Sequence, residues 1–128
     1  MVKTSIVVLL LEPDEQLAQN YTNALTQAGE KVMWATTAQQ ALQTIDTKTP
    51  DIIVLEINLI EHNGIEFLYE LQSYADTSKI PVILVTYSTK KELGLTRKQQ
   101  EKLSIIEYCY KPKTTIEDLV HAVQGIVL

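Results

Sequence analysis

The sequence predicts an α/β domain built on a doubly wound five-stranded parallel sheet with helices on both faces. Short, continuously apolar runs alternate with segments in which apolar residues recur every three or four positions, and the connections between them are short. Continuous apolar runs suit strands that are covered on both faces, and right-handed crossovers place the connecting helices on the two sides. We expect residues 1–128 to form a single domain of this kind.

Each strand is expected where an apolar run is bounded by turn or helix-starting residues. The first, Ser5–Leu11, stops at Glu12-Pro13, because proline has no N–H to continue a ladder. The third starts after Pro50 and ends in a single carboxylate. The five predicted strands are Ser5–Leu11, Lys31–Thr36, Asp51–Glu56, Val82–Thr86 and Ser104–Tyr110.

The helices are expected between these strands. The first runs from about Asp14 to Ala28, because Pro13 can open a helix and Gly29 can end one. The polar segment 88–103 has the weakest helical pattern of the chain. The other helices are predicted after Thr37, from Asn63-Gly64 to about Tyr74, and after Thr114, which has Glu117 three residues on as in a capping box.

Charge and composition exclude several classes of function. The net charge is −5 and the basic residues are scattered, apart from Lys90-Lys91 and Arg97-Lys98, which argues against a direct nucleic-acid partner. The apolar runs are too short to span a bilayer, and the first residues have no signal-peptide layout. The single Cys109 forms no intrachain disulfide and suits a reducing compartment. We therefore expect a cytoplasmic protein with no membrane contact.

Four polar residues follow or end predicted strands: Glu12, Glu56, Thr86 and Lys111. The carboxyl ends of parallel strands meet at one edge of the sheet, where ligands of such folds bind. Two acids beside one lysine could hold a divalent cation or pair with the lysine. Dinucleotide fingerprints, P-loops and the Gly-x-Ser-x-Gly elbow are absent from the sequence.

The ordered set of these segments resembles the receiver domain of two-component response regulators, the CheY-like members of the flavodoxin-like folds. The resemblance covers essentially the whole chain. It rests on Leu11-Glu12-Pro13-Asp14, on Asp51–Glu56 through Asn63-Gly64, on Val85-Thr86 and on Tyr108-Cys109-Tyr110-Lys111-Pro112.

The resemblance implies roles for these positions. In such receivers, acids after the first strand bind Mg²⁺ and an Asp that ends the third strand accepts a phosphoryl group. Thr86 and Lys111 match the residues that contact that phosphoryl group. Tyr108 matches the aromatic residue that changes rotamer as the threonine moves, although it could equally be an edge-strand aromatic packed on the last helix. Glu12 fills the first acidic position, and it would share with Glu56 whatever metal the site binds.

Three positions depart from the family pattern. Glu56 stands where the phosphoacceptor Asp belongs, and it extends the carboxylate by one methylene, of order 1 Å, enough to cost about 10²-fold in rate. Pro13 replaces the second acid and supplies no oxygen for Mg²⁺, and Asp14 should point away from the site. Tyr87 places a large ring where a small residue is usual and a phosphodonor would approach.

These departures predict a degenerate receiver that acts as a phosphorylation-independent interaction module, without enzymatic activity, and with Mg²⁺ binding at most weakly. The alternative is an unconventional phosphoacceptor at Glu56 with Mg²⁺-dependent self-phosphotransfer. Glu56 itself could be a plain ion pair with Lys111 or could imitate a phosphorylated aspartate.

The expected partners are signalling proteins, either a histidine kinase or an output protein. The last strand and its flanking helices are the predicted docking face, and a homodimer could form through the same face. Cys109 is expected to be buried, Trp34 to pack on its sheet face, and His62 and His121 to be isolated surface residues.

Overall fold

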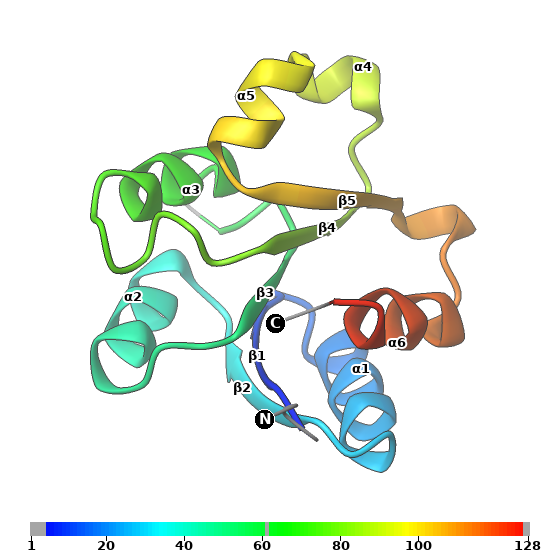
Figure 1. Ribbon diagram of the computed structural model, residues 1–128. Helices are drawn as coiled ribbons and strands as arrows, with labels where there is room; N and C mark the ends of the chain where they lie inside the picture. Colours follow the sequence, from blue (N-terminus) through cyan, green and yellow to red (C-terminus); the bar gives the residue numbers. More distant parts are fainter. Residues whose placement is uncertain (1–4, 61, 127–128) are drawn as a thin grey trace.

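The computed structural model of the chain describes residues 5–60 and 62–126, and within them five parallel strands form one sheet in the order β2-β1-β3-β4-β5 (Figure 1). The predicted doubly wound sheet is thereby confirmed. The strands end within two residues of their predicted bounds. They are β1 (Val7–Leu11), β2 (Lys31–Ala35), β3 (Ile52–Leu55), β4 (Val82–Thr86) and β5 (Ile105–Tyr110).

Helices cover both faces of the sheet (Figure 1). On one face lie α1 (Glu15–Gln27) and α6 (Ile116–Gln124), and on the other lie α2 (Ala38–Thr47), α3 (Gly64–Gln72), α4 (Lys90–Leu93) and α5 (Arg97–Lys102). A 3₁₀ turn, η1 (Lys111–Lys113), follows β5. Among the described residues no helix is long and apolar enough to cross a bilayer.

The interior strand β1, which lies between β2 and β3, explains the continuous apolar pattern. Leu9 and Leu11 pack into the core beneath α2 and α3, while Val8 and Leu10 pack beneath α1 and α6, and all four are buried. Such two-sided burial needs apolar residues at every position rather than at alternate ones. It fixes the carboxyl end of β1 between β2 and β3, where Glu12 follows.

The side chain of Trp34, on the edge strand β2, does not lie where the sequence predicts. Trp34 was expected to pack on its sheet face, but its side chain is 42% exposed. The strand is at the rim of the sheet, where no further strand covers it, and the indole N–H donates a hydrogen bond to the carbonyl of Glu12 at 2.9 Å. Trp34 therefore holds the backbone just after β1.

The helix caps agree with the sequence except at the last helix. Asp14 caps α1 by accepting a hydrogen bond from the N–H of Leu17, so its carboxylate is used at the start of the helix. The predicted cap of the last helix is wrong by one residue, since Thr115 and Asp118 form the capping box of α6. Thr114 instead ends the η1 turn, where its hydroxyl donates to the carbonyl of Tyr110.

The segment 88–103 forms two short helices instead of one. Each begins with its own capping box, Thr89 with Glu92 for α4 and Thr96 with Gln99 for α5. Gly94 ends α4 at φ 61°, a left-handed conformation that favours glycine. The apolar residues of the two helices do not follow one continuous helical period, because the chain changes direction at Gly94. The segment therefore has a weak helical pattern in the sequence.

The strand β5 contains a bulge. Val82 pairs with Ile105 but Ile83 pairs with Glu107, so Ile106 is an extra residue that bends the strand. Ile106 is exposed, and the alternation after it buries Cys109 against α6, as expected. Burial raises the pKa of the Cys109 thiol to about 11, which keeps the thiol protonated and unreactive.

Candidate functional site

The structure brings together the four polar residues that the sequence places at strand ends. Glu12 follows β1, Glu56 follows β3, Thr86 ends β4 and Lys111 follows β5. All four are buried, with exposed fractions of 8% or less. A buried cluster of three charged side chains and one hydroxyl therefore lies at the carboxyl edge of the sheet.

Lys111 connects the two acids. Its Nζ lies 2.6 Å from Oε1 of Glu12 and 2.9 Å from Oε1 of Glu56. Two carboxylates thus share one ammonium, and the buried group has a net charge of −1 when all three side chains are ionised. The other oxygen of Glu12 accepts a hydrogen bond from the N–H of Asp14 at 3.0 Å.

Glu56 accepts hydrogen bonds through both of its carboxylate oxygens. Its Oε2 accepts from the hydroxyl of Thr86 and from the N–H of Asn58 at 3.0 Å. Its Oε1 accepts from Lys111 and, at 3.3 Å, from the N–H of Tyr87. Both oxygens of this carboxylate are therefore used by donors from the ends of β3, β4 and β5.

The pKa directions follow from burial and pairing. The pKa of Glu12 lies above its ordinary value, because burial outweighs the hydrogen bonds from Lys111 and the N–H of Asp14. Burial alone would lower the pKa of Lys111, but its hydrogen bonds to Glu12 and Glu56 outweigh burial and raise it. Both shifts favour the protonated form, as expected of a buried cluster with excess negative charge.

A glycine shapes the loop that supplies Asn58. The N–H of Gly64 donates to the carbonyl of Ile57 at 2.8 Å, which brings Gly64 back to the end of β3. A Cβ at Gly64 would come within 2.9 Å of the Cα of Ile57, so a side chain there would push the loop away. The close approach keeps the N–H of Asn58 directed at Glu56.

Two tyrosines flank Lys111. The ring centroid of Tyr87 lies 4.6 Å from Nζ of Lys111, a cation–π contact, while the ring itself is 56% exposed. Tyr87 therefore covers the ammonium from the solvent side. Tyr21 of α1 lies beside the same cluster; burial raises its pKa, and the charge of Lys111 lowers it in part. The sequence pattern marked Tyr21 only as a core position of its helix.

Tyr108 is linked to the cluster through Ser88. The N–H of Ser88 donates to the hydroxyl oxygen of Thr86 at 3.1 Å, and its carbonyl accepts from the hydroxyl of Tyr108 at 2.6 Å. Nδ2 of Asn58 also donates to the hydroxyl of Ser88 at 3.0 Å. Hydrogen bonds thus lead from Glu56 to Tyr108 along the loop between β4 and α4.

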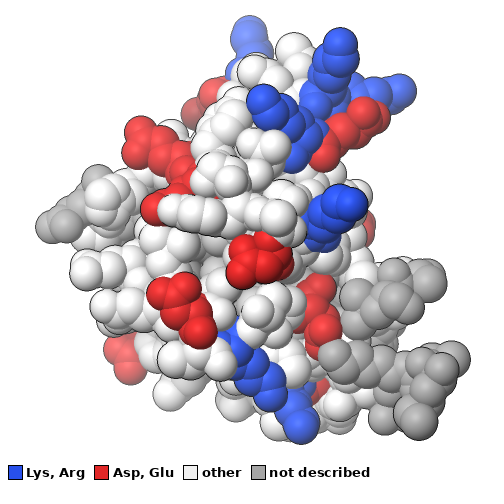
Figure 2. All heavy atoms as spheres, turned by 60° about the vertical axis from the view of Figure 1, so that its left-hand side comes forward, with Lys and Arg blue, Asp and Glu red and all other residues white. Residues whose placement is uncertain are grey.

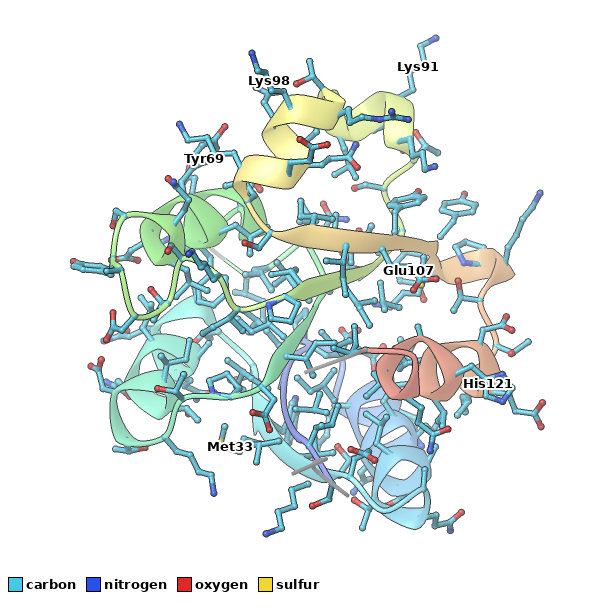
Figure 3. All side chains as sticks on the ribbon, in the orientation of Figure 1. Met33, Tyr69, Lys91, Lys98, Glu107 and His121 are labelled. Atoms are coloured by element: carbon cyan, nitrogen blue, oxygen red, sulfur yellow. The ribbon has the colours of Figure 1, made fainter. Side chains whose placement is uncertain are left out.

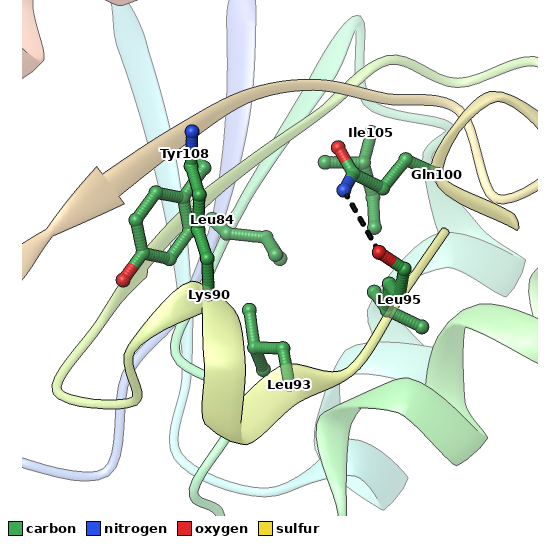
Figure 4. Close-up of a pocket in the computed structure, with 7 residues that line it drawn as sticks. All are labelled: Leu84, Lys90, Leu93, Leu95, Gln100, Ile105 and Tyr108. Atoms are coloured by element: carbon green, nitrogen blue, oxygen red, sulfur yellow. Dashed lines mark hydrogen bonds between the residues drawn. The ribbon is translucent and has the colours of Figure 1, made fainter. Parts of the chain in front are cut away.

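The ring of Tyr108 forms one wall of a small cavity beneath α4 and α5 (Figure 4). The cavity has a volume of about 10 Å³, which leaves room for about one water molecule. Nζ of Lys90 lies 5.4 Å from the ring centroid of Tyr108. The other lining residues are Leu84, Leu93, Leu95, Gln100 and Ile105. The conformation of Tyr108 is therefore coupled to the packing of both helices.

The residues present do not fit a magnesium site. Mg²⁺ needs near-octahedral oxygen ligands. Lys111 and backbone N–H groups already use the oxygens of Glu12 and Glu56, and Pro13 offers no side-chain oxygen. Among the described residues no group of three or more His, Cys, Asp or Glu side chains is placed to hold a metal ion.

Known proteins share this fold. The sequence-family model of the response regulator receiver domain matches residues 8–124 of the chain. The chain belongs to the response regulator receiver family. It is thus a receiver domain of two-component signal transduction.

The relatives and solved structures agree with this family. The chain is 30% identical over 124 residues to the probable transcriptional regulator ycf29 of Cyanophora paradoxa, covering 95% of this chain and 56% of that protein. It is 33% identical over 79 residues to the KDP operon transcriptional regulatory protein KdpE of Escherichia coli (strain K12), covering 62% of this chain and 34% of that protein. The chain therefore spans less than two thirds of the length of these curated relatives.

Among solved structures, the chemotaxis protein CheY4 of Vibrio cholerae superposes with a TM-score of 0.83 at 20% identity, covering 97% of this chain and 100% of that chain. A two-component response regulator from Clostridium difficile gives a TM-score of 0.77 at 20% identity, with 93% of each chain covered. At these identities the likeness shows the fold alone.

Proposed function

We propose that this receiver domain acts without phosphorylation, as a protein-interaction module in which the carboxylate of Glu56 stands in for a phosphoryl group. The observation that carries the proposal is the set of donors on Glu56. Thr86 and Lys111 are the two side chains that contact the phosphoryl group in receivers that this chain resembles, and here both donate directly to Glu56. The side chain of Glu is one methylene longer than that of Asp, and here it contacts both donors without a phosphoryl group.

The connection to Tyr108 supports a fixed rather than a switched state. Because Thr86 is held by Glu56, its hydroxyl oxygen stays in place to accept from the N–H of Ser88. The carbonyl of Ser88 then holds the hydroxyl of Tyr108. We propose that Glu56 keeps this aromatic residue in the arrangement that phosphorylation imposes on other receivers.

Phosphotransfer to Glu56 is disfavoured by the same contacts. An attacking carboxylate oxygen must give up its donors, and both oxygens of Glu56 are already bound. Tyr87 covers Lys111 on the solvent side, and Pro13 removes a ligand that Mg²⁺ would need. We therefore propose that the domain catalyses no phosphotransfer and binds Mg²⁺ weakly at most.

The proposed partners are signalling proteins of the two-component type, a histidine kinase or an output protein. The last strand and its flanking helices remain the predicted docking face, since Tyr108 lies there and is coupled to Glu56. The net charge of −5 gives no reason to propose a direct nucleic-acid contact. We propose a cytoplasmic location because the single Cys109 suits a reducing compartment.

Incubation with acetyl phosphate and Mg²⁺, followed by intact-mass measurement, tests this proposal. The chain is expected to keep its unmodified mass at times when receivers with an Asp phosphoacceptor are labelled. A stoichiometric added phosphoryl mass that disappears in Glu56→Gln would support the unconventional phosphoacceptor instead.

A further inference from the structure

A groove between α2 and α3 is lined with acidic residues and has an apolar floor. It consists of two open clefts of about 400 and 250 Å³, which meet at Leu42. Phe67 contributes to the floor of the larger cleft. The carboxylates on its rim are Glu66 and Glu70 at one end and Asp46 and Asp76 at the other. Among the described residues that line the groove none is Lys or Arg.

A group of exposed cations lies on the two short helices α4 and α5. This basic patch consists of Lys90, Lys91, Arg97, Lys98 and Lys102, all exposed. Figure 3 shows Lys91 and Lys98 pointing away from the sheet. Residues that look scattered as two short pairs in the sequence therefore form one surface, because Gly94 folds α4 next to α5.

The charge of the molecule is distributed unevenly between the segment that contains the basic patch and the rest of the chain. Segment 90–102 has five basic and two acidic residues, a net charge of +3, which leaves −8 for the rest of the chain, whose total is −5. In Figure 2 most blue side chains gather at the top of the molecule, while red ones are spread over the face below. The basic patch and the acidic groove are thus separate surfaces of opposite sign.

We propose that the basic patch of one copy docks in the α2–α3 groove of a second copy. Opposite potentials favour this contact, and the aliphatic stems of lysine side chains suit an apolar floor beneath an acidic rim. The chain carries both surfaces, so every molecule meets a partner of the required chemistry. The proposal does not depend on the state of Glu56 and goes beyond the function proposed above.

The symmetry of this contact determines what it builds. Patch and groove are different surfaces, so the contact is heterologous, and each added copy leaves one patch and one groove free. Association is therefore open-ended or closes into a ring, in contrast to a two-fold dimer through β5. Because the charges are exposed, salt must weaken the contact, since the Debye length falls from about 10 Å at 0.1 M to about 3 Å at 1 M.

Sedimentation velocity over a series of concentrations tests the proposal. The unmodified chain is expected to form oligomers larger than a dimer at low salt, with at least tenfold weaker association at high salt. Lys91→Gln/Lys98→Gln neutralises two cations of the patch, and Glu66→Gln/Glu70→Gln neutralises two carboxylates of the groove. Each variant alone should be monomeric. Lys113→Gln/Glu117→Gln, at exposed positions outside both surfaces, is the matched control and should assemble normally.

A mixture of the two monomeric variants is decisive. The patch variant keeps an intact groove and the groove variant keeps an intact patch, so the mixture should form a 1:1 dimer that grows no further. A chain that stays monomeric at all concentrations overturns the proposal, as does a mixture that stays monomeric. Loss of assembly in the patch variant alone, with normal assembly of the groove variant, would indicate a dimer through the β5 face instead.

Discussion

Lys111 pairs with Glu56 at 2.9 Å although 55 residues separate them in the chain. The pair exists because β3 and β5 end at the same edge of a parallel sheet, with β4 between them. Glu12 makes the group a triad in which one cation serves two buried anions. The stability of the site and its proposed independence of phosphate both depend on this sharing.

Replacing Lys111 should destabilise the fold strongly. Lys111→Met leaves Glu12 and Glu56 buried beside each other without a cation, and loss of one partner of a buried ion pair costs about 3–5 kcal/mol. Urea unfolding measures the free energy of unfolding. The control Lys113→Met, at an exposed position of the same turn, should change it by no more than about 0.5 kcal/mol. Equal effects of the two substitutions would show that the triad does not stabilise the fold.

The raised pKa of Glu12 predicts a pH dependence of stability. A carboxyl group whose folded pKa lies above its unfolded value stabilises the fold fully below pH 4.5, and this contribution is lost as pH rises through the folded pKa. The chain should therefore lose stability relative to Glu12→Gln as the pH rises from 4.5 through that value. Denaturant unfolding of both proteins at several pH values gives the difference, in which other titrating groups cancel. A difference that grows in the opposite direction would mean that pairing with Lys111 outweighs burial.

The hydroxyl of Tyr108 should hold the start of α4. Tyr108→Phe keeps the ring that lines the cavity but removes the donor to the carbonyl of Ser88, a loss of about 1 kcal/mol. Amide hydrogen exchange of residues 88–95 should become faster in this variant. Tyr110→Phe, two residues along the same strand, serves as the control and should leave these rates unchanged. Unchanged exchange rates of residues 88–95 in Tyr108→Phe would show that the hydroxyl of Tyr108 does not stabilise this loop.

Restoring the acids of the family pattern should restore phosphorylation. Pro13→Asp/Glu56→Asp supplies the missing metal ligand and the shorter acceptor. Because a lost ligand or supporting residue costs roughly 10–100-fold in metal affinity, we expect at least a tenfold gain in Mg²⁺-dependent labelling by acetyl phosphate over the unmodified chain. Pro13→Ala/Glu56→Asp is the control that lacks the metal ligand, and intact mass is the measurement. Labelling of the unmodified chain to the same extent as a labelled double variant would contradict the proposed inactivity of Glu56.

Much of the fold could be predicted from the sequence because buried parallel strands need apolar residues at every position. The alternation of such runs with helical periods predicts the sheet, and the sheet brings Glu12, Glu56, Thr86 and Lys111 together. This convergence is a property of the backbone topology, so it required no knowledge of side-chain contacts.

The remaining features depend on contacts that residue types do not specify. The N–H groups of Asn58 and Tyr87 bind Glu56 through the backbone, and any residue other than proline could supply them. The break between α4 and α5 did have a signal, since Thr89 and Thr96 each precede Glu or Gln by three residues. The exposure of Trp34 follows from the position of β2 at the sheet edge, which the strand order decides.

We propose that the charge of Glu56 holds Thr86, Ser88 and Tyr108 in place without phosphate. NMR spectra of the chain and of Glu56→Gln, each with and without Mg²⁺ and beryllofluoride as a phosphoryl analogue, test it most directly. In the unmodified chain the signals of these residues should not respond to the analogue. Glu56→Gln keeps the size of the side chain but removes its charge. Without the analogue, the signals of these residues in the variant should therefore be shifted from their positions in the unmodified chain. Saturable shifts in the unmodified chain, or an unchanged spectrum in the variant, would contradict the claim.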